Sequence, residues 1–242
     1  MNATVPEEPA TRGRKHFKAK VCLVGNPAVG KTSLVRRYVL NAFDDRYLTT
    51  VGTKVSKKPV RVVDPSTDLD ADIDLMIWDI MGQPGFREML KDAYFFDAKG
   101  VLAVADLTRK DTLEDLRSWI TAVEGVTGKV PIVVAVNKSD LTGNAVYSTA
   151  DAVQAAEALG ADVFLTSAKT GDNVEEAFRR LGARVSHNAV RGNGNSGRTR
   201  LAPRNHPGSH GRSLNPRSNW RYPTLRQSVH DVHRAGAGAN VS

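Results

Sequence analysis

The chain has 242 residues, of which 40% are hydrophobic and 25% charged, and its formal net charge is +8. This composition is typical of a globular protein with one α/β domain and additional chain. No apolar run reaches the ~18 residues of a membrane-spanning helix, and the N-terminus lacks the apolar core of a signal peptide, so we expect a cytoplasmic protein.

The positive charge is concentrated near the C-terminus. From Arg184 onward the chain holds ten Arg, no Lys and a single acidic residue, Asp231, which gives this part a charge of +9 and the rest −1. The only cysteine, Cys22, lies in an apolar run, where we expect a buried thiol. Since no cysteine follows it, the sequence predicts no intrachain disulfide and no prenyl anchor.

Strand and helix patterns alternate along most of the chain, which favours a mostly parallel sheet covered by helices. A turn-forming segment at 64–71 predicts that the second and third strands are antiparallel, with one of them at the sheet edge. The predicted strands are 19–24, 54–63, 72–79, 100–106, 131–137 and 162–166, and the predicted helices are 31–41, 86–95, 111–124, 149–158 and 173–185.

The periodic pattern stops near residue 186. The sequence beyond it is rich in Gly, Asn, Ser, Pro and Arg and poor in large apolar residues, so it cannot bury enough surface to offset its ordering entropy. We therefore expect three parts: a disordered N-terminal segment (1–17), a folded domain (18–185) and a disordered basic tail (186–242).

The segment "GNPAVGKTS" (25–33) follows the first predicted strand and leads into the first predicted helix. Gly25, Gly30, Lys31 and Thr32 match the phosphate-loop pattern G-x-x-x-x-G-K-[ST]. Backbone N–H groups of such a loop surround phosphates, and the hydroxyl of the last residue coordinates Mg²⁺. This spacing predicts a nucleotide phosphate site rather than an ordinary glycine-rich turn.

Three more motifs stand at the ends of predicted strands, where open α/β sheets bind ligands. In "WDIMGQ" (78–83), Asp79 is placed to hold Mg²⁺ through water, the Gly82 N–H to reach a γ-phosphate, and Gln83 to orient an attacking water. In "NKSD" (137–140), Asp140 can accept hydrogen bonds from two guanine N–H groups that adenine lacks. Backbone N–H groups of "TSAK" (166–169) suit the guanine O6. Together the motifs predict a guanine nucleotide.

With these motifs, the chain from about 18 to 184 resembles a small GTPase of the Ras superfamily, closest to the Rab branch. Phe43 and Thr50 follow Lys31 at the spacings at which that family places an aromatic over the guanine edge and the switch threonine. "TVG" (50–52) and Trp78 also resemble the Rab pattern. The resemblance implies a P-loop NTPase fold with a six-stranded, mostly parallel sheet, one antiparallel edge strand and five helices. It also implies binding of GTP and GDP with Mg²⁺, and slow hydrolysis of GTP.

Residue roles also follow from the resemblance. Lys31 would contact the β- and γ-phosphates, Lys138 would pack along the base, and the Ala168 N–H would bind O6. The expected catalytic residues are Gln83, Lys31, Thr50 and Gly82, and the expected Mg²⁺ ligands are Thr32, Thr50 and Asp79. The expected nucleotide contacts are Gly25, Pro27, Ala28, Val29, Gly30, Lys31, Thr32, Ser33, Phe43, Thr50, Gly82, Asn137, Lys138, Asp140, Ser167, Ala168 and Lys169.

The implied partners are effector, GAP and exchange-factor proteins that contact a monomer through 43–53 and 82–92. Pro27 stands where Ras has glycine, and because Gln83 is present we expect hydrolysis to survive. Arg87 and Arg109 could form salt bridges or contact a partner, but we expect solvated surface residues. The alternative is a nucleotide-stabilised binding module whose basic tail recognises a protein, RNA or an anionic lipid surface. Thr50 and Gln83 favour the switch, because a purely structural nucleotide site needs neither.

Overall fold

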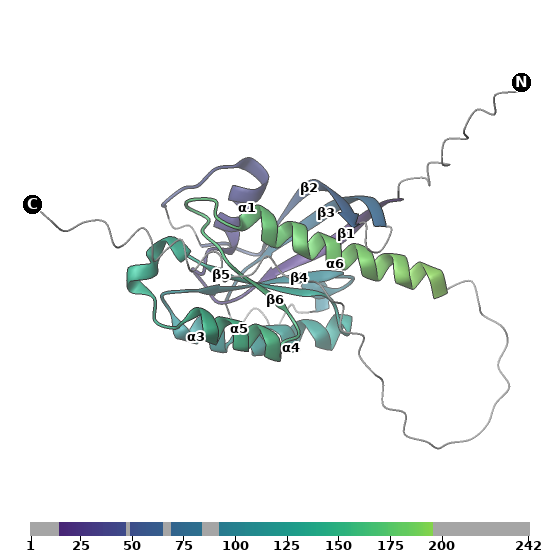
Figure 1. The fold of residues 1–242 in the computed structure, drawn as a ribbon. Coiled ribbons are helices and arrows are strands. Elements are labelled where there is room, and N and C mark those ends of the chain that lie inside the picture. Colours follow the sequence, from purple (N-terminus) through teal and green to yellow (C-terminus); the bar gives the residue numbers. More distant parts are fainter. Residues whose placement is uncertain (1–14, 47–48, 65–68, 84–91, 196–242) are drawn as a thin grey trace, which may run out of the picture. The chain divides into compact units, whose positions relative to one another are not determined.

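The computed structural model describes residues 15–46, 49–64, 69–83 and 92–195, with side chains described as far as 190. Figure 1 shows a sheet between two layers of helices. The strands are β1 (Lys15–Val24), β2 (Thr53–Asp64), β3 (Leu69–Ile80), β4 (Gly100–Asp106), β5 (Ile132–Asn137) and β6 (Asp162–Leu165). The helices are α1 (Lys31–Leu40), α3 (Lys110–Glu114), α4 (Leu116–Thr127), the 3₁₀ helix η1 (Ser139–Asn144), α5 (Thr149–Ala158) and α6 (Val174–Asn195).

The six strands form one sheet in the order β2-β3-β1-β4-β5-β6. β2 is at the edge and antiparallel to β3, whereas all other neighbouring pairs are parallel, so the predicted topology is confirmed. Every residue of β4 and β5 is buried, as the continuous apolar runs of these strands indicate. The carboxyl ends of the parallel strands therefore meet at one edge of the sheet.

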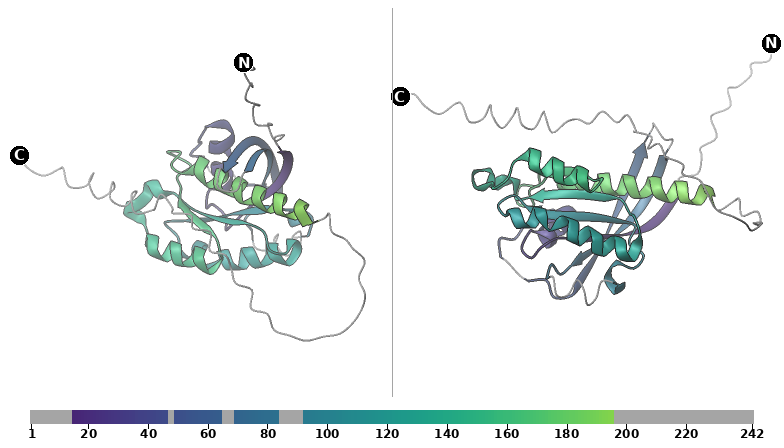
Figure 2. Two further views of the ribbon diagram at one scale, coloured as in Figure 1. Left: turned by 45° about the vertical axis from the view of Figure 1, so that its right-hand side comes forward. Right: turned by 90° about the horizontal axis from the view of Figure 1, so that it is seen from below.

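Two apolar cores lie on the two faces of this sheet. One face packs against α1 and α6, and the other against α4 and α5 (Figures 1 and 2). Tyr38 of α1 stacks on Phe178 of α6 with ring centroids 4.1 Å apart, which ties these two helices together. No helix within the described residues is long and apolar enough to cross a bilayer.

Some element boundaries differ from the sequence-based expectations. The predicted helix 111–124 is divided into α3 and α4 at Asp115, which keeps helical dihedral angles but accepts a hydrogen bond from the Asn26 side chain. β1 begins at Lys15, before the expected domain start at 18, because it pairs with β3 from Ala71 onward. Of the predicted helix 86–95, only 92–95 falls within the described residues, and that part is helical.

The last helix is longer than expected. α6 runs to Asn195 instead of ending at 185, so the expected tail boundary at 186 is wrong for 186–195. Tertiary contacts account for the extension: Ser186 is buried, the His187 ring nitrogen lies 2.8 Å from Asp64 Oδ2, and Val190 packs against the core. Residues 1–14 and 196–242, where we also expect disorder, lie outside the described part.

Candidate functional site

A cavity of about 600 Å³ opens at the carboxyl edge of the parallel strands. Its lining comes from the loop after β1, the start of α1, the segment before β2, and the loops after β3, β5 and β6. Most predicted site residues line it: the nucleotide contacts Pro27, Ala28, Gly30, Lys31, Thr32, Ser33, Phe43, Thr50, Gly82, Asn137, Lys138, Asp140, Ala168 and Lys169, and the catalytic residue Gln83. The lining also includes Arg36, Asp44, Asp45, Arg46, Thr49, Met81 and Leu141.

The phosphate loop curls around the Lys31 ammonium. Lys31 Nζ donates to the carbonyl oxygens of Gly25 at 2.7 Å and Asn26 at 2.9 Å, and the side chain is buried. Burial lowers the pKa of Lys31 to about 8, although Asp79 opposes this shift and Arg109 adds to it. An anion beside the ammonium would favour its charged form, so the loop is suited to bind phosphate.

Two glycines allow the walls of the cavity to approach closely. Gly30 has φ +96°, and a Cβ there would lie 2.2 Å from Asn137 Nδ2. A Cβ at Gly82 would lie 2.5 Å from Lys31 Nζ. The first close approach brings the phosphate loop against the end of β5, and the second brings the segment after β3 against the lysine.

A cluster of oxygen atoms lies beside Lys31. Thr32 Oγ1 donates to Asp79 Oδ2 at 2.5 Å and lies 2.9 Å from Thr50 Oγ1. Asp79 is 1% exposed, its Oδ1 is buried with no hydrogen-bond partner, and burial raises its pKa despite the Thr32 bond and the nearby lysines. Hydroxyl and carboxylate oxygens are the ligands that Mg²⁺ prefers, and an orphaned buried carboxylate oxygen needs a cation or a water. These residues therefore fit Mg²⁺.

The loops after β5 and β6 hold one another and the phosphate loop. Asn137 Nδ2 donates to the Val29 carbonyl oxygen at 2.9 Å, and Asn137 Oδ1 accepts from the Ala168 N–H at 3.1 Å. The Ser167 hydroxyl donates to Asp140 Oδ1 at 2.6 Å. The Asp140 carboxylate is thus fixed at one end of the cavity, with Lys31 and Thr32 at the phosphate end.

Some predicted site residues do not line the cavity. Gly25, Val29, Ser167 and Asp79 lie behind its wall and act on lining groups through the contacts above. Gln83 does line the cavity, and its side chain is exposed.

Several side-chain contacts that support the site are not indicated by any of the motifs. Arg37 of α1 donates from Nε to the Ala168 carbonyl oxygen at 2.8 Å and from Nη2 to that of Lys169 at 2.5 Å, so α1 holds the loop after β6. Asn26 accepts a hydrogen bond from the buried Trp119 indole at 2.9 Å. These contacts join residues far apart in sequence, and no local spacing indicates them.

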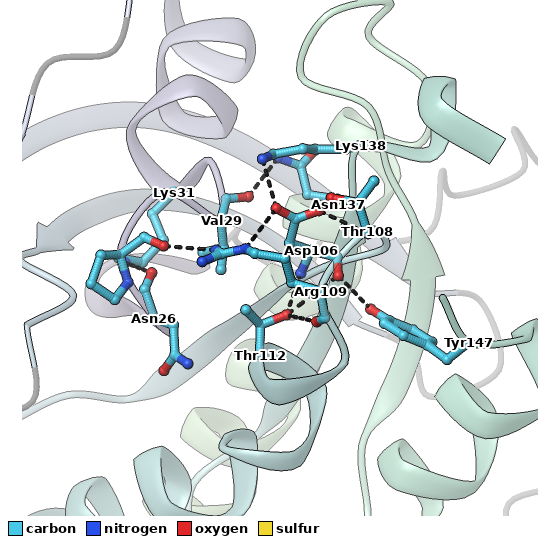
Figure 3. Close-up of polar contacts among 11 residues, drawn as sticks. Asn26, Val29, Lys31, Asp106, Thr108, Arg109, Thr112, Asn137, Lys138 and Tyr147 are labelled. Carbon is cyan, nitrogen blue, oxygen red and sulfur yellow. Dashed lines mark hydrogen bonds and ion pairs between the residues drawn. The ribbon is translucent and has the colours of Figure 1, made fainter. Parts of the chain in front are cut away.

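Asp106 and Arg109 form another such group (Figure 3). The expectation that Arg109 is a solvated surface residue is wrong, because its guanidinium bonds to Asp106 and to the Pro27 carbonyl oxygen. The only sequence signal of the ion pair between Asp106 and Arg109 is that Asp106, the last residue of β4, follows an apolar run.

Comparisons with known proteins agree with this geometry. The model of the Ras family matches residues 20–187. The chain is 35% identical to the Ras-related protein Rab-21 of Geodia cydonium, over 74% of this chain and 76% of that protein. It is 36% identical to Rab-2B of Dictyostelium discoideum (66% and 77% covered) and 34% identical to human Rab-27A (70% and 79%). The chain therefore belongs to the Ras family, is Rab-like, and is a small GTPase that acts as a switch between GTP and GDP forms.

Proposed function

We propose that the switch operates through the cavity at the carboxyl edge of the sheet, where the chain binds guanine nucleotide with Mg²⁺ and hydrolyses GTP slowly. The observation that carries this proposal is that one cavity is lined by Lys31 at one end and Asp140 at the other. A lysine in a phosphate loop suits the phosphates, and a carboxylate suits the N–H donors of guanine.

At the phosphate end, Lys31 binds the β- and γ-phosphates, and backbone N–H groups of 27–33 surround them. Thr32 and Thr50 would hold Mg²⁺, with Asp79 acting through water. When bound, the ion neutralises negative charge on the phosphate oxygens. The Gly82 N–H binds the γ-phosphate, so Thr50 and Gly82 are the residues that distinguish GTP from GDP.

At the base end, Asp140 accepts hydrogen bonds from the N1–H and N2–H groups of guanine. Ser167 holds that carboxylate in place, Phe43 covers the guanine edge, and Lys138 packs its stem along the base. The Ala168 N–H, which now donates to Asn137 Oδ1, binds O6 in this proposal.

In hydrolysis, Gln83 orients the water that attacks the γ-phosphate. Pro27 lines the same cavity, and we expect it to leave this role intact, because a proline ring points away from the route of the glutamine more readily than a β-branched side chain does. Without an arginine supplied by a partner, turnover is slow.

The test is single-turnover hydrolysis of GTP in the presence of Mg²⁺. Gln83→Leu removes the amide that orients water, and we expect hydrolysis at least about tenfold slower, with GTP binding retained. Gln154→Leu is the control, because it makes the same change on the exposed face of α5. Equal rates for wild type and Gln83→Leu would remove Gln83 from the mechanism.

Signal transduction in the cytoplasm, through effector, GAP and exchange-factor proteins, belongs to the same proposal. In this family the γ-phosphate and Mg²⁺ order two switch segments, which correspond here to 43–53 and 82–92, and these would contact the partners. Residues 47–48 and 84–91 lie outside the described part of the chain. Val51 in the first segment is 87% exposed, which leaves an apolar side chain free for a partner.

A further inference from the structure

The strand order places β4 between β1 and β5. The loop after β1 is the phosphate loop, and the loop after β5 begins with Lys138, which lines the base end of the cavity. Asp106 is the last residue of β4. Its side chain therefore lies between the two loops that hold opposite ends of a nucleotide.

The Asp106 carboxylate contacts groups on both sides. Its Oδ2 lies 2.6 Å from Lys138 Nζ and 3.2 Å from Arg109 Nε, and its Oδ1 accepts from the N–H and hydroxyl of Thr108 at 2.9 and 2.7 Å. Asp106 is completely buried. Burial alone would raise its pKa, but the hydrogen bonds from Lys138 and Thr108 outweigh burial and hold the pKa below its ordinary value. The group is therefore an anion at neutral pH.

The backbone of Asp106 is fixed as well as its side chain. Its N–H donates to the Thr112 hydroxyl at 2.9 Å, and its carbonyl oxygen accepts from the Tyr147 hydroxyl at 3.1 Å. The Arg109 N–H donates to the same carbonyl oxygen at 3.0 Å, which closes a tight turn and returns the arginine beside the carboxylate (Figure 3).

The Arg109 guanidinium makes a second contact across the site. Its Nη2 donates to the Pro27 carbonyl oxygen at 2.8 Å. Pro27 has no N–H, and the next residue, Ala28, has φ +62°, a left-handed conformation that costs free energy for a residue with a Cβ. A planar guanidinium presents its N–H donors in a rigid arrangement, whereas an ammonium is a compact charge at the end of a flexible side chain. Arg109 does not line the cavity, so it acts through the loop and not on the nucleotide.

We infer that Arg109 is a positioning residue which, through the shared Asp106 carboxylate, braces the phosphate loop against the Lys138 loop and slows release of guanine nucleotide. Because one anion holds both cations, movement of either loop away from the nucleotide must break a charge-assisted hydrogen bond. This inference rests on the proposed nucleotide site and adds a determinant of how long the nucleotide stays bound.

The test uses the full chain loaded with a fluorescent N-methylanthraniloyl GDP and chased with excess GDP in Mg²⁺. Arg109→Gln removes the guanidinium that bonds Asp106 and the Pro27 carbonyl oxygen. We expect this variant to release GDP about tenfold faster than wild type, as for loss of one charge-assisted hydrogen bond. Arg109→Lys should fall between this variant and wild type, because an ammonium keeps the charge but lacks the rigid arrangement of donors that joins the two acceptors. Lys110→Gln, the same charge change at the next, exposed residue, should release GDP at the wild-type rate.

A double-mutant cycle with Asp106→Asn distinguishes two cases: Arg109 acts through the Asp106 carboxylate on both loops, or it acts on the phosphate loop alone. If the carboxylate transmits the effect, Arg109→Gln should change release by less than about twofold in the Asp106→Asn background. The inference is overturned if Arg109→Gln speeds release in the Asp106→Asn background as much as it does in wild type. It is also overturned if the single variant Arg109→Gln releases GDP at the wild-type rate. If Asp106→Asn does not fold, the release rates of the single variants decide: the inference requires that release become faster in the order wild type, Arg109→Lys, Arg109→Gln. Failure of wild type to retain labelled GDP would instead overturn the proposed site itself.

Discussion

At the scale of single residues, we propose that the choice of base depends on Asp140. The Ser167 hydroxyl donates to one carboxylate oxygen at 2.6 Å, and the Thr170 N–H donates to the Ser167 oxygen at 3.1 Å. This chain of hydrogen bonds restrains the carboxylate before any base arrives, which reduces the entropy lost on binding. Guanine offers two N–H donors to such a group, and adenine does not.

Exchange of the carboxylate for an amide should therefore change the preferred base. Asp140→Asn keeps an oxygen for the Ser167 hydroxyl but presents an N–H where guanine also has one, so GDP affinity should fall by about 100-fold or more. Binding of xanthosine diphosphate, which has a carbonyl oxygen at that position, should rise. Competition binding with GDP, xanthosine diphosphate and ADP measures both effects.

Asp172→Asn is the matched control, because Asp172 also accepts from a hydroxyl, that of Thr170, in the neighbouring loop. It should leave the base preference unchanged. If Asp140→Asn binds GDP as tightly as wild type does, Asp140 does not read the base.

Residues of the site differ in how far the sequence could predict them. Lys31, Thr32 and Asp140 belong to motifs with fixed local spacing, and the structure brings them to one cavity. Arg109 and Pro27 are 82 positions apart, and their contact depends on the strand order that places β4 beside β1. Such a contact can be predicted only from the tertiary fold. The sequence pattern therefore wrongly predicted a solvated side chain for Arg109.

At the scale of secondary structure, local signals fixed some boundaries well. Ser148 accepts from the Asp151 N–H at 3.2 Å, and the Asp151 carboxylate accepts from the Ser148 N–H at 2.8 Å, so a capping box, which depends on local spacing alone, begins α5. α6 shows the opposite case. Its extension past 185 depends on contacts with Asp64 and the core rather than on local helix signals.

The capping box should contribute measurably to stability. Ser148→Ala removes the side-chain acceptor and should lower the free energy of unfolding by about 1 kcal/mol. Urea unfolding of the GDP-saturated protein, followed by circular dichroism, measures the change. Thr149→Ala, one residue further into the helix, should cause no comparable loss. An equal loss in both variants would show that the cap hydrogen bonds are not the cause.

At the scale of the whole molecule, a nearly neutral folded part precedes a strongly basic segment. The alternation of strands and helices predicted the mostly parallel sheet, because parallel neighbours follow from helical crossovers, and the turn-forming segment at 64–71 predicted its antiparallel edge strand. The basic segment after 195 lies outside the described residues, and its recognition of a protein, RNA or anionic lipid stays a prediction. The central claim concerns the folded part: the γ-phosphate changes the segments around Thr50 and Gly82.

Hydrogen–deuterium exchange tests this claim most directly, by comparing the protein loaded with Mg²⁺-GDP and with a Mg²⁺-bound non-hydrolysable GTP analogue. We predict slower exchange at 49–53 and 81–83 in the GTP-analogue form, unchanged exchange in β5, and loss of the difference at 49–53 in Thr50→Ala. Identical exchange profiles for the two wild-type forms would contradict the account and favour a nucleotide that only stabilises the fold.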